Sequence, residues 1–96
     1  MATYRAYMMA ADRGTQETYD FEADDDLMAR SPIRVVRTFF EAVEAEGFPK
    51  GDLDFEINAA FRRTAGTREV VTAMGALNIE GNRGPAMPFM VMIAPA

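Results

Sequence analysis

One segment of this chain, residues 31–47, carries the repeat of an amphipathic helix, and it limits the possible fold more than any other feature. Ser31 can cap the first backbone N–H groups, Pro32 suits the first helical position, and Gly47 can adopt the left-handed conformation that ends a helix. At about 100° per residue, charged residues fall on one side and apolar residues on the other. The apolar side consists of Ile33, Val35, Val36, Phe39, Phe40, Ala42 and Val43. A helix with so broad an apolar face needs a sheet on which to pack.

The segments before this helix have the alternation of β-strands. Residues 3–11 and 16–22 predict two strands joined by a glycine-containing turn, which is typical of a hairpin. Residues 23–30 are open to two interpretations. They form either a short helical turn, separated from the main helix by a break before Pro32, or the start of a single bent helix over residues 25–46.

After the helix, residues 53–62, 69–80 and 87–94 predict three more strands, and residues 63–67 predict the turn between the first two of them. The first of these strands alternates most clearly, and its predicted core side consists of Leu53, Phe55, Ile57, Ala59 and Phe61. Gly75 falls inside the second strand. A glycine there indicates a bulge or the close approach of a bulky group, for which an aromatic side chain of the helix is the candidate.

The order of elements is therefore strand, strand, helix, strand, strand, strand, which predicts an α+β fold. We expect a two-layer sandwich in which one main helix packs on a five-stranded antiparallel or mixed sheet. The first and last strands are apolar on both sides, so they are expected to lie together at the centre of the sheet, in the order 2-1-5-4-3. A chain of 96 residues is long enough for one hydrophobic core, and residues 1–96 are predicted to form a single domain.

The chain has no histidine and no cysteine, which removes most routes to catalysis and to metal binding. We therefore expect no catalytic residues, no metal site and no cofactor. An enzyme would have to use carboxylates or tyrosines at a subunit interface, and Asp54 with Glu56 is the carboxylate pair that one strand face offers. The acidic residues between Glu17 and Asp26 are of the kind that binds a hard cation. They lack the spacing of a calcium loop, and a solvated turn with helix-capping acids explains them.

A net charge of −5 argues against binding of nucleic acid or of an anionic membrane surface by the protein as a whole. No stretch approaches the roughly 20 apolar residues that span a bilayer, and the N-terminal residues do not have the pattern of a signal peptide. Together with the lack of cysteine, these features predict a soluble protein of the cytoplasm.

Because the helix covers one face of the sheet, the other face of the two central strands is predicted to be exposed. Tyr7, Met9, Met90 and Met92 would lie there. An apolar surface of this kind is typical of a contact site, and methionine is common where surfaces adapt to partners. We therefore expect a non-enzymatic domain that acts by self-association, as a homo-oligomer, or by binding a protein partner. The alternative is that sheet twist and long side chains such as that of Arg5 cover this surface.

Three arginines, Arg62, Arg63 and Arg68, flank the predicted turn at residues 63–67. Arginine can bind phosphate or carboxylate groups in a bidentate manner, and loops are where binding residues concentrate. This gives an alternative function, a small-ligand or anion-binding protein that uses these arginines and the open face of the sheet. The simpler interpretation is that the arginines only make the hairpin tip hydrophilic.

Overall fold

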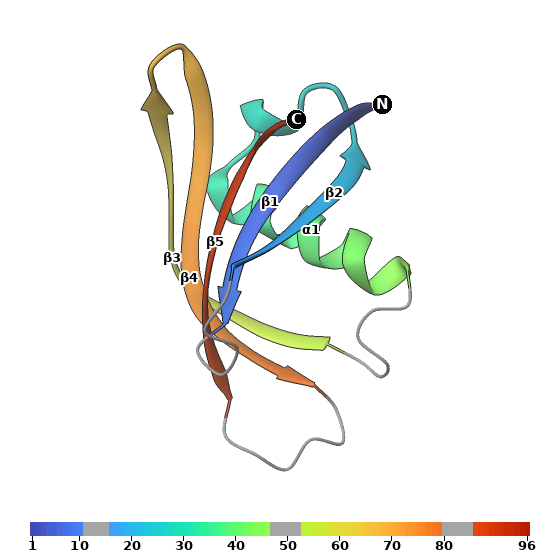
Figure 1. Cartoon of the computed structure of the whole chain (residues 1–96), viewed down its shortest axis with the longest axis vertical. Helices are drawn as coiled ribbons and strands as arrows, with labels where there is room; N and C mark the ends of the chain where they lie inside the picture. The colour runs from blue at the N-terminus through green and yellow to red at the C-terminus, as the bar shows by residue number, and fades with distance from the viewer. Residues whose placement is uncertain (11–15, 47–52, 80–85) are drawn as a thin grey trace.

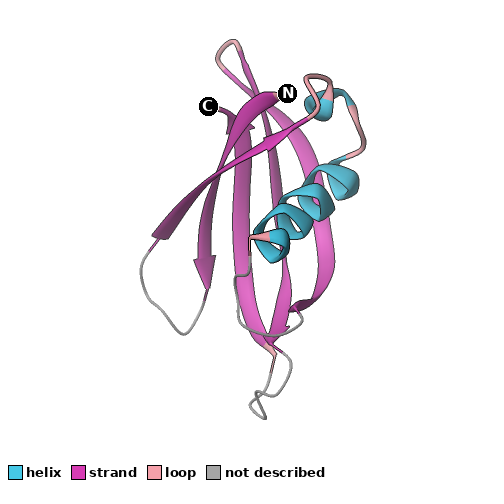
Figure 2. Ribbon diagram, turned by 90° about the vertical axis from the view of Figure 1, so that its right-hand side faces the viewer, coloured by secondary structure: helices cyan, strands magenta, loops and turns pink. Residues whose placement is uncertain are grey.

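The computed structural model describes residues 1–10, 16–46, 53–79 and 86–96. Within these ranges the elements are β1 (Ala2–Ala10), β2 (Gln16–Ala23), the single-turn 3-10 helix η1 (Leu27–Ala29), α1 (Pro32–Ala45), β3 (Leu53–Ala65), β4 (Arg68–Ile79) and β5 (Met87–Pro95). These five strands form one sheet in the order β2-β1-β5-β4-β3, and α1 lies across one face of it (Figures 1 and 2). The structure confirms the predicted α+β sandwich and its strand order. Every neighbouring pair of strands is antiparallel, which settles the open choice of direction.

The two central strands, β1 and β5, are apolar on both sides. On the side that faces α1, the buried Ala6 of β1 lies opposite the buried Ile93 of β5. On the other side, Tyr7 lies opposite Met92. A strand at the centre of a sheet has no free backbone edge and can be apolar on both faces, so these two strands take the middle and the half-polar β2 and β3 take the edges.

The helix α1 begins as the sequence predicts. Pro32 is its first residue, and the Ser31 hydroxyl accepts a hydrogen bond from the backbone N–H of Arg34 at 3.4 Å. The preceding turn η1 is separate, because Arg30 has an extended backbone between the two helices. The short-turn interpretation of residues 23–30 is therefore correct, and the single bent helix is wrong. Gly47, the predicted helix stop, lies outside the described residues.

One residue of the predicted apolar side of the helix is not covered. Ile33 is 48% exposed, whereas the buried residues of α1 are Val35, Val36, Phe39 and Phe40. At the helical repeat, Ile33 is rotated by about 90° from the middle of that group. It therefore stands at the border of the apolar stripe, and the sheet does not cover it.

Aromatic rings fill the space between α1 and the sheet. Phe40 packs between Phe55 of β3, at 4.5 Å between ring centroids, and Phe89 of β5, at 5.3 Å. Phe39 contacts Phe21 of β2 at 5.4 Å. One face of the helix thus reaches both edges of the sheet, and the twisted sheet partly wraps around it (Figures 1 and 2).

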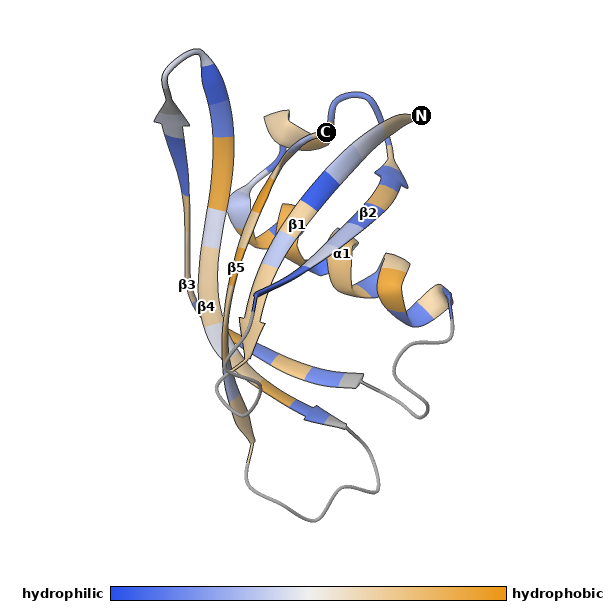
Figure 3. Ribbon diagram, viewed as in Figure 1, coloured by the Kyte–Doolittle hydropathy of each residue, from blue (hydrophilic) through white to orange (hydrophobic). Residues whose placement is uncertain are grey.

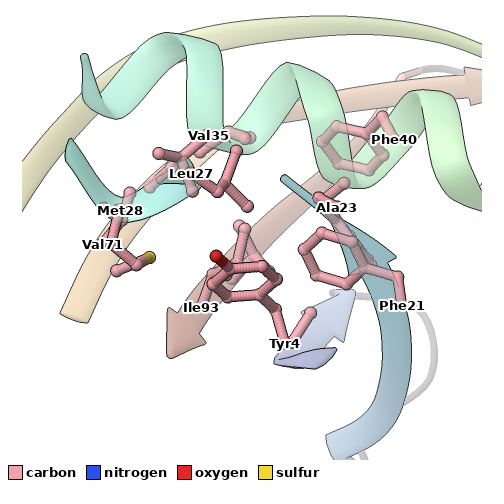
Figure 4. Close-up of a cluster of buried hydrophobic side chains, with 14 of the residues drawn as sticks. Tyr4, Phe21, Ala23, Leu27, Met28, Val35, Phe40, Val71 and Ile93 are labelled. Carbon is pink, nitrogen blue, oxygen red and sulfur yellow. The ribbon is translucent and has the colours of Figure 1, made fainter. Parts of the chain in front are cut away.

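The core is closed at the other end by η1. Its residues Leu27 and Met28 are buried in the same cluster as Val71 of β4 (Figure 4). Tyr4 is also buried there, and its hydroxyl donates a hydrogen bond to the backbone carbonyl of Asp24 at 2.6 Å. The polar end of the tyrosine is therefore satisfied, as burial requires.

A bulge in β3 changes which side chains face the core. The pairing with β4 shifts between Ile57 and Ala59. Opposite the bulge stands Gly75, where a Cβ atom would lie 1.8 Å from the backbone carbonyl oxygen of Glu56. The predicted bulge is therefore present, but it belongs to β3, and the group that comes close to Gly75 is backbone of β3 rather than an aromatic ring of the helix.

The bulge makes the predicted facing of two residues wrong. Ala59 and Phe61 were expected on the core side, but both lie on the face away from α1, where Phe61 is 44% exposed. One extra residue in a strand reverses the facing of everything after it. At the tip of this hairpin both strands reach into the predicted turn, because β3 continues to Ala65 and β4 begins at Arg68. The turn occupies only Gly66 and Thr67, and Gly66 supplies the positive φ of 66° that it needs.

Candidate functional site

The open face is the side of the sheet opposite α1. Its residues form rows across the strands, in which each residue is paired with the next. One row contains, from β2 to β3, Gln16, Met9, Met90, Met74 and Ala59. The next row contains Thr18, Tyr7, Met92, Thr72 and Phe61. Large apolar side chains therefore occupy adjacent positions on four neighbouring strands.

We call the apolar part of these two rows the methionine patch; it consists of Tyr7, Met9, Phe61, Met74, Met90 and Met92. Five of its members are well exposed, from 41% for Met74 and Met92 to 50% for Met90. Of the large apolar side chains that are exposed in the described part of the chain, the others are Met1 and Ile33. In Figure 3 the apolar colouring runs along β5 in the middle of the sheet, and the hydrophilic colouring lies at the β3–β4 tip. Five of the seven exposed large apolar side chains in the described ranges lie on the open face.

The structure places all four residues predicted for this surface, Tyr7, Met9, Met90 and Met92, on the open face and next to one another. It adds two that sequence reasoning missed. Met74 could have been found from the alternation of β4, which puts it on the side opposite Val71 and Ala73. Phe61 could not have been found from alternation alone, since the bulge that exposes it is signalled only by the glycine in the neighbouring strand.

Beside the methionine patch lies a row with charged ends. Arg5 on β1 pairs with Asp20 on β2, with Nε to Oδ1 at 2.8 Å, and Arg63 on β3 closes the opposite end of the row. Between them stand the buried Ala94 and Val70. The hydrogen bond from Arg5 holds the pKa of the Asp20 carboxyl below its ordinary value, and the same bond raises the pKa of Arg5.

At this end of the open face the two outer strands carry charges of opposite sign, and Arg5 of β1 is paired with Asp20 beside the acidic strand. The acidic rim is formed by Asp20 and Glu22 on the edge strand β2. The basic rim is formed by Arg63 and Arg68 on the β3–β4 hairpin. The two rims lie at the same end of the sheet and on opposite sides of β5, because β5 pairs with β1 on one side and β4 on the other.

The three arginines of the hairpin tip do not converge on one site. Arg62 lies on the helix side and donates hydrogen bonds to the backbone carbonyls of Met28, at 2.6 Å, and of Arg30. Arg68 donates to the carbonyl of Pro95. Arg63 is on the open face, one position along the strand from Arg62. Two of the three guanidinium groups are therefore engaged by backbone carbonyls, in different directions.

A shallow hollow of about 540 Å³ lies between the end of α1 and the strand β2. Its lining includes the carboxylates Asp20, Glu22 and Glu46 and the small residues Ala42 and Ala45. An acidic lining repels an anionic ligand, so the hollow does not suit the phosphate or carboxylate groups considered for the arginines.

Two acidic residues shortly before α1 form ion pairs with the same arginine. The Nη2 atom of Arg30 lies 3.2 Å from Oδ2 of Asp24 and 3.6 Å from Oδ1 of Asp26. In the part of the chain that the structure describes, no three acidic side chains are grouped as a metal site requires. Of the acidic residues between Glu17 and Asp26, Asp24 and Asp26 are therefore paired with one neighbouring arginine.

Among the described residues, no helix has the length and apolar character needed to cross a membrane. The geometry of the open face must be interpreted from its own chemistry, since the comparisons with other proteins add no model for it. No protein-family model, no curated protein and no solved structure was found to match this chain.

Proposed function

We propose that this protein is a non-enzymatic association domain whose open sheet face binds the apolar surface of another protein molecule, either a second copy of itself or a different partner. The observation that carries the proposal is the methionine patch, six neighbouring apolar side chains of which five are well exposed. A contiguous exposed patch of this kind marks interaction sites. Methionine side chains are flexible and adapt to the shape of what they contact.

The arrangement around the patch has the anatomy of an interface. Its apolar centre lies on β1, β5 and β4, while charged residues stand at the sides, Asp20 and Glu22 on β2 and Arg63 on β3. Interfaces generally combine an apolar core with a polar rim. Enzymatic chemistry has less support, because strongly perturbed, buried groups are the usual mark of an active site. In the described chain no aspartate, glutamate, lysine or arginine is buried, and the hydroxyl of the buried Tyr4 is bonded to a backbone carbonyl.

The alternative function, anion binding by the arginines, has weaker support. Arg62 and Arg68 already donate to backbone carbonyls, and Arg62 faces away from Arg63. The cytoplasmic location remains part of the proposal and rests on the lack of cysteine in the chain.

The proposal is tested by placing a charge in the middle of the patch. In Met92→Glu a carboxylate replaces an exposed side chain on the central strand, and we expect the assembly formed by the wild-type protein to be lost, since contact would bury an unpaired charge. The measurement is sedimentation velocity over a dilution series from near-millimolar to low-micromolar protein.

The matched control is Ile33→Glu, which introduces the same charge at an apolar residue of similar exposure on α1, away from the open face. It should assemble like the wild type. If Met92→Glu and Ile33→Glu both assemble like the wild type, the open face is not the association surface.

A further inference from the structure

We propose that the occupant of the open face is a second copy of this chain, related to the first by a two-fold axis that runs parallel to β5 between the two sheets. This inference rests on the proposed function and narrows it to a face-to-face homodimer. The argument comes from the segregation of charge on the face, from what a two-fold rotation does to it, and from the size of the face.

A rotation about an axis along β5 exchanges the two sides of the sheet and keeps the position along the strands. β5 then lies over β5 of the second copy, β1 over β4, and β2 over β3, because β5 is the middle strand of the order β2-β1-β5-β4-β3. Such a contact is isologous, so every pairing occurs twice. Met90 and Met92 on the axis approach their own copies, and Met9 faces Met74 of the second copy.

The same rotation brings opposite charges together. The acidic rim on β2 of one copy, Asp20 and Glu22, lies over the basic rim of the other, in which Arg63 is on β3. Because both rims are at the same end of the sheet, both pairs form at once. A protein with a net charge of −5 is repelled by its own copy in most orientations. Orientations that place the acidic rim of one copy over the basic rim of the other are therefore favoured.

A two-fold axis perpendicular to the strands matches the rims less well. It would place the basic rim over the opposite end of β3, where Asp54 and Glu56 lie on the open side. The segment of β3 before the bulge, however, and the part of β4 paired with it bend away from the rest of the sheet (Figure 1), and Asp54 and Glu56 belong to that bent segment. The axis along β5 keeps the contact within the part of the sheet that contains the patch and both rims.

The size of the face predicts a weak dimer. Four strand spacings of about 4.8 Å and three row spacings of about 7 Å give a face on the order of 400 Å². Standard stable interfaces bury about 800 Å² per partner. The dimer is therefore expected to dissociate on dilution in the micromolar range and to be sensitive to the charges at its rims.

The test exchanges charges across the predicted contact. Under this rotation Arg63 lies opposite Asp20 of the second copy, and Glu22 is one row further along β2. Glu22→Arg therefore puts an arginine one row from Arg63 of the second copy, and Arg63→Glu puts a glutamate next to both Asp20 and Glu22 of the second copy, twice in each homodimer. For each variant alone, the dissociation constant of the homodimer should be about three- to tenfold higher than for the wild type. An equimolar mixture restores opposite charges at both contacts, so it should form a heterodimer at least as strongly as the wild type forms a homodimer. Sedimentation at low ionic strength, where screening is weakest, is the measurement.

The matched controls are Glu41→Arg and Arg37→Glu, which make the same charge changes on the exposed side of α1. Each control changes the net charge as much as the corresponding rim variant does. Any difference between a rim variant and its control therefore reports the position of the charge, and the mixture of the two controls should dimerise like the wild type.

If the two rim variants dimerise like the wild type and their mixture is no stronger, the two-fold pairing is wrong. If the wild type is a monomer at every concentration, the second copy is excluded as the occupant, although the open face can still bind a different protein. If Met92→Glu also fails to disturb an assembly that the wild type forms, the proposed function itself fails.

Discussion

At the scale of single residues, Gly75 shows how a neighbouring strand can decide what a position tolerates. A glycine inside a strand normally weakens it, and alanine is usually better there by about 0.5–1 kcal/mol. Here the Cβ of an alanine would meet the carbonyl oxygen of Glu56 at 1.8 Å, and that oxygen is backbone. The usual preference is therefore reversed by the bulge.

We expect Gly75→Ala to lower the free energy of unfolding by about 1–3 kcal/mol, because β3 must move away from the new methyl group. Denaturant unfolding followed by circular dichroism measures the change. The control is Gly66→Asn at the tip of the same hairpin, where nothing lies within 4 Å of an added Cβ and where asparagine accepts the positive φ. A Gly75→Ala protein as stable as the wild type would show that the bulge can relax without cost.

Also at this scale, the ion pair between Arg5 and Asp20 makes a prediction about titration. The hydrogen bond from Arg5 lowers the pKa of Asp20, so the contribution of this carboxylate to stability is present above the ordinary aspartate pKa and is lost as the pH falls through the lowered value. In Arg5→Gln the pKa of Asp20 should return towards its ordinary value. An NMR titration of the Asp20 side chain in both proteins measures this directly. Identical Asp20 titration curves in the two proteins would contradict the pairing.

At the scale of elements, α1 and the sheet depend on each other through a few aromatic contacts. Phe40 is buried between Phe55 and Phe89, which belong to strands on either side of β4. Phe40 therefore packs the helix against both β3 and β5, the two strands that flank β4. The helix alone would be marginal in water at this length, and packing of its apolar face supplies the stability it lacks.

We expect Phe40→Ala to lower the free energy of unfolding by about 3–5 kcal/mol, because it removes a buried ring and leaves a cavity. Ile33→Ala on the same helix should change it by no more than about 0.5 kcal/mol, since Ile33 is half exposed. Both values come from chemical denaturation of the two variants. Alanine has a higher helix propensity than either residue, so a similar loss in both would contradict the view that the buried contacts of Phe40 dominate.

At the scale of the whole molecule, one sheet has two separate apolar faces. One face is buried by α1 and η1, and the other, the open face, leaves Met9, Met90 and Met92 between 41% and 50% exposed. Because the core does not use the open face, changes there should affect assembly without affecting the fold. Met92→Glu, the variant that is expected to abolish assembly, should therefore keep the monomer's free energy of unfolding within about 0.5 kcal/mol of the wild-type value. Denaturation at a concentration below the assembly range checks this, and a large loss would mean that Met92 supports the fold itself.

Much of the fold follows from local pattern. Ser31 and Pro32 mark the start of the helix because capping and a fixed φ act within a few residues. The two-sided apolar character of β1 and β5 gives the centre of the sheet, since edge strands are rarely apolar on both faces. The same reasoning placed Tyr7, Met9, Met90 and Met92 on the open face.

Other features depend on contacts between segments that are distant in sequence, and only the tertiary structure decided them. The facing of Phe61 and Arg62 depends on a bulge in β3, and Gly75 in β4 leaves room for the bulged backbone because it has no side chain. The separation of the three arginines depends on carbonyl groups of η1 and of β5 that accept their hydrogen bonds. The sequence by itself determined the elements, their order and the apolar character of the open face, because these depend on short-range periodicity. The tertiary structure decided which side chains past the bulge share that face and which charges flank it, because strand register is set by contacts between distant parts of the chain.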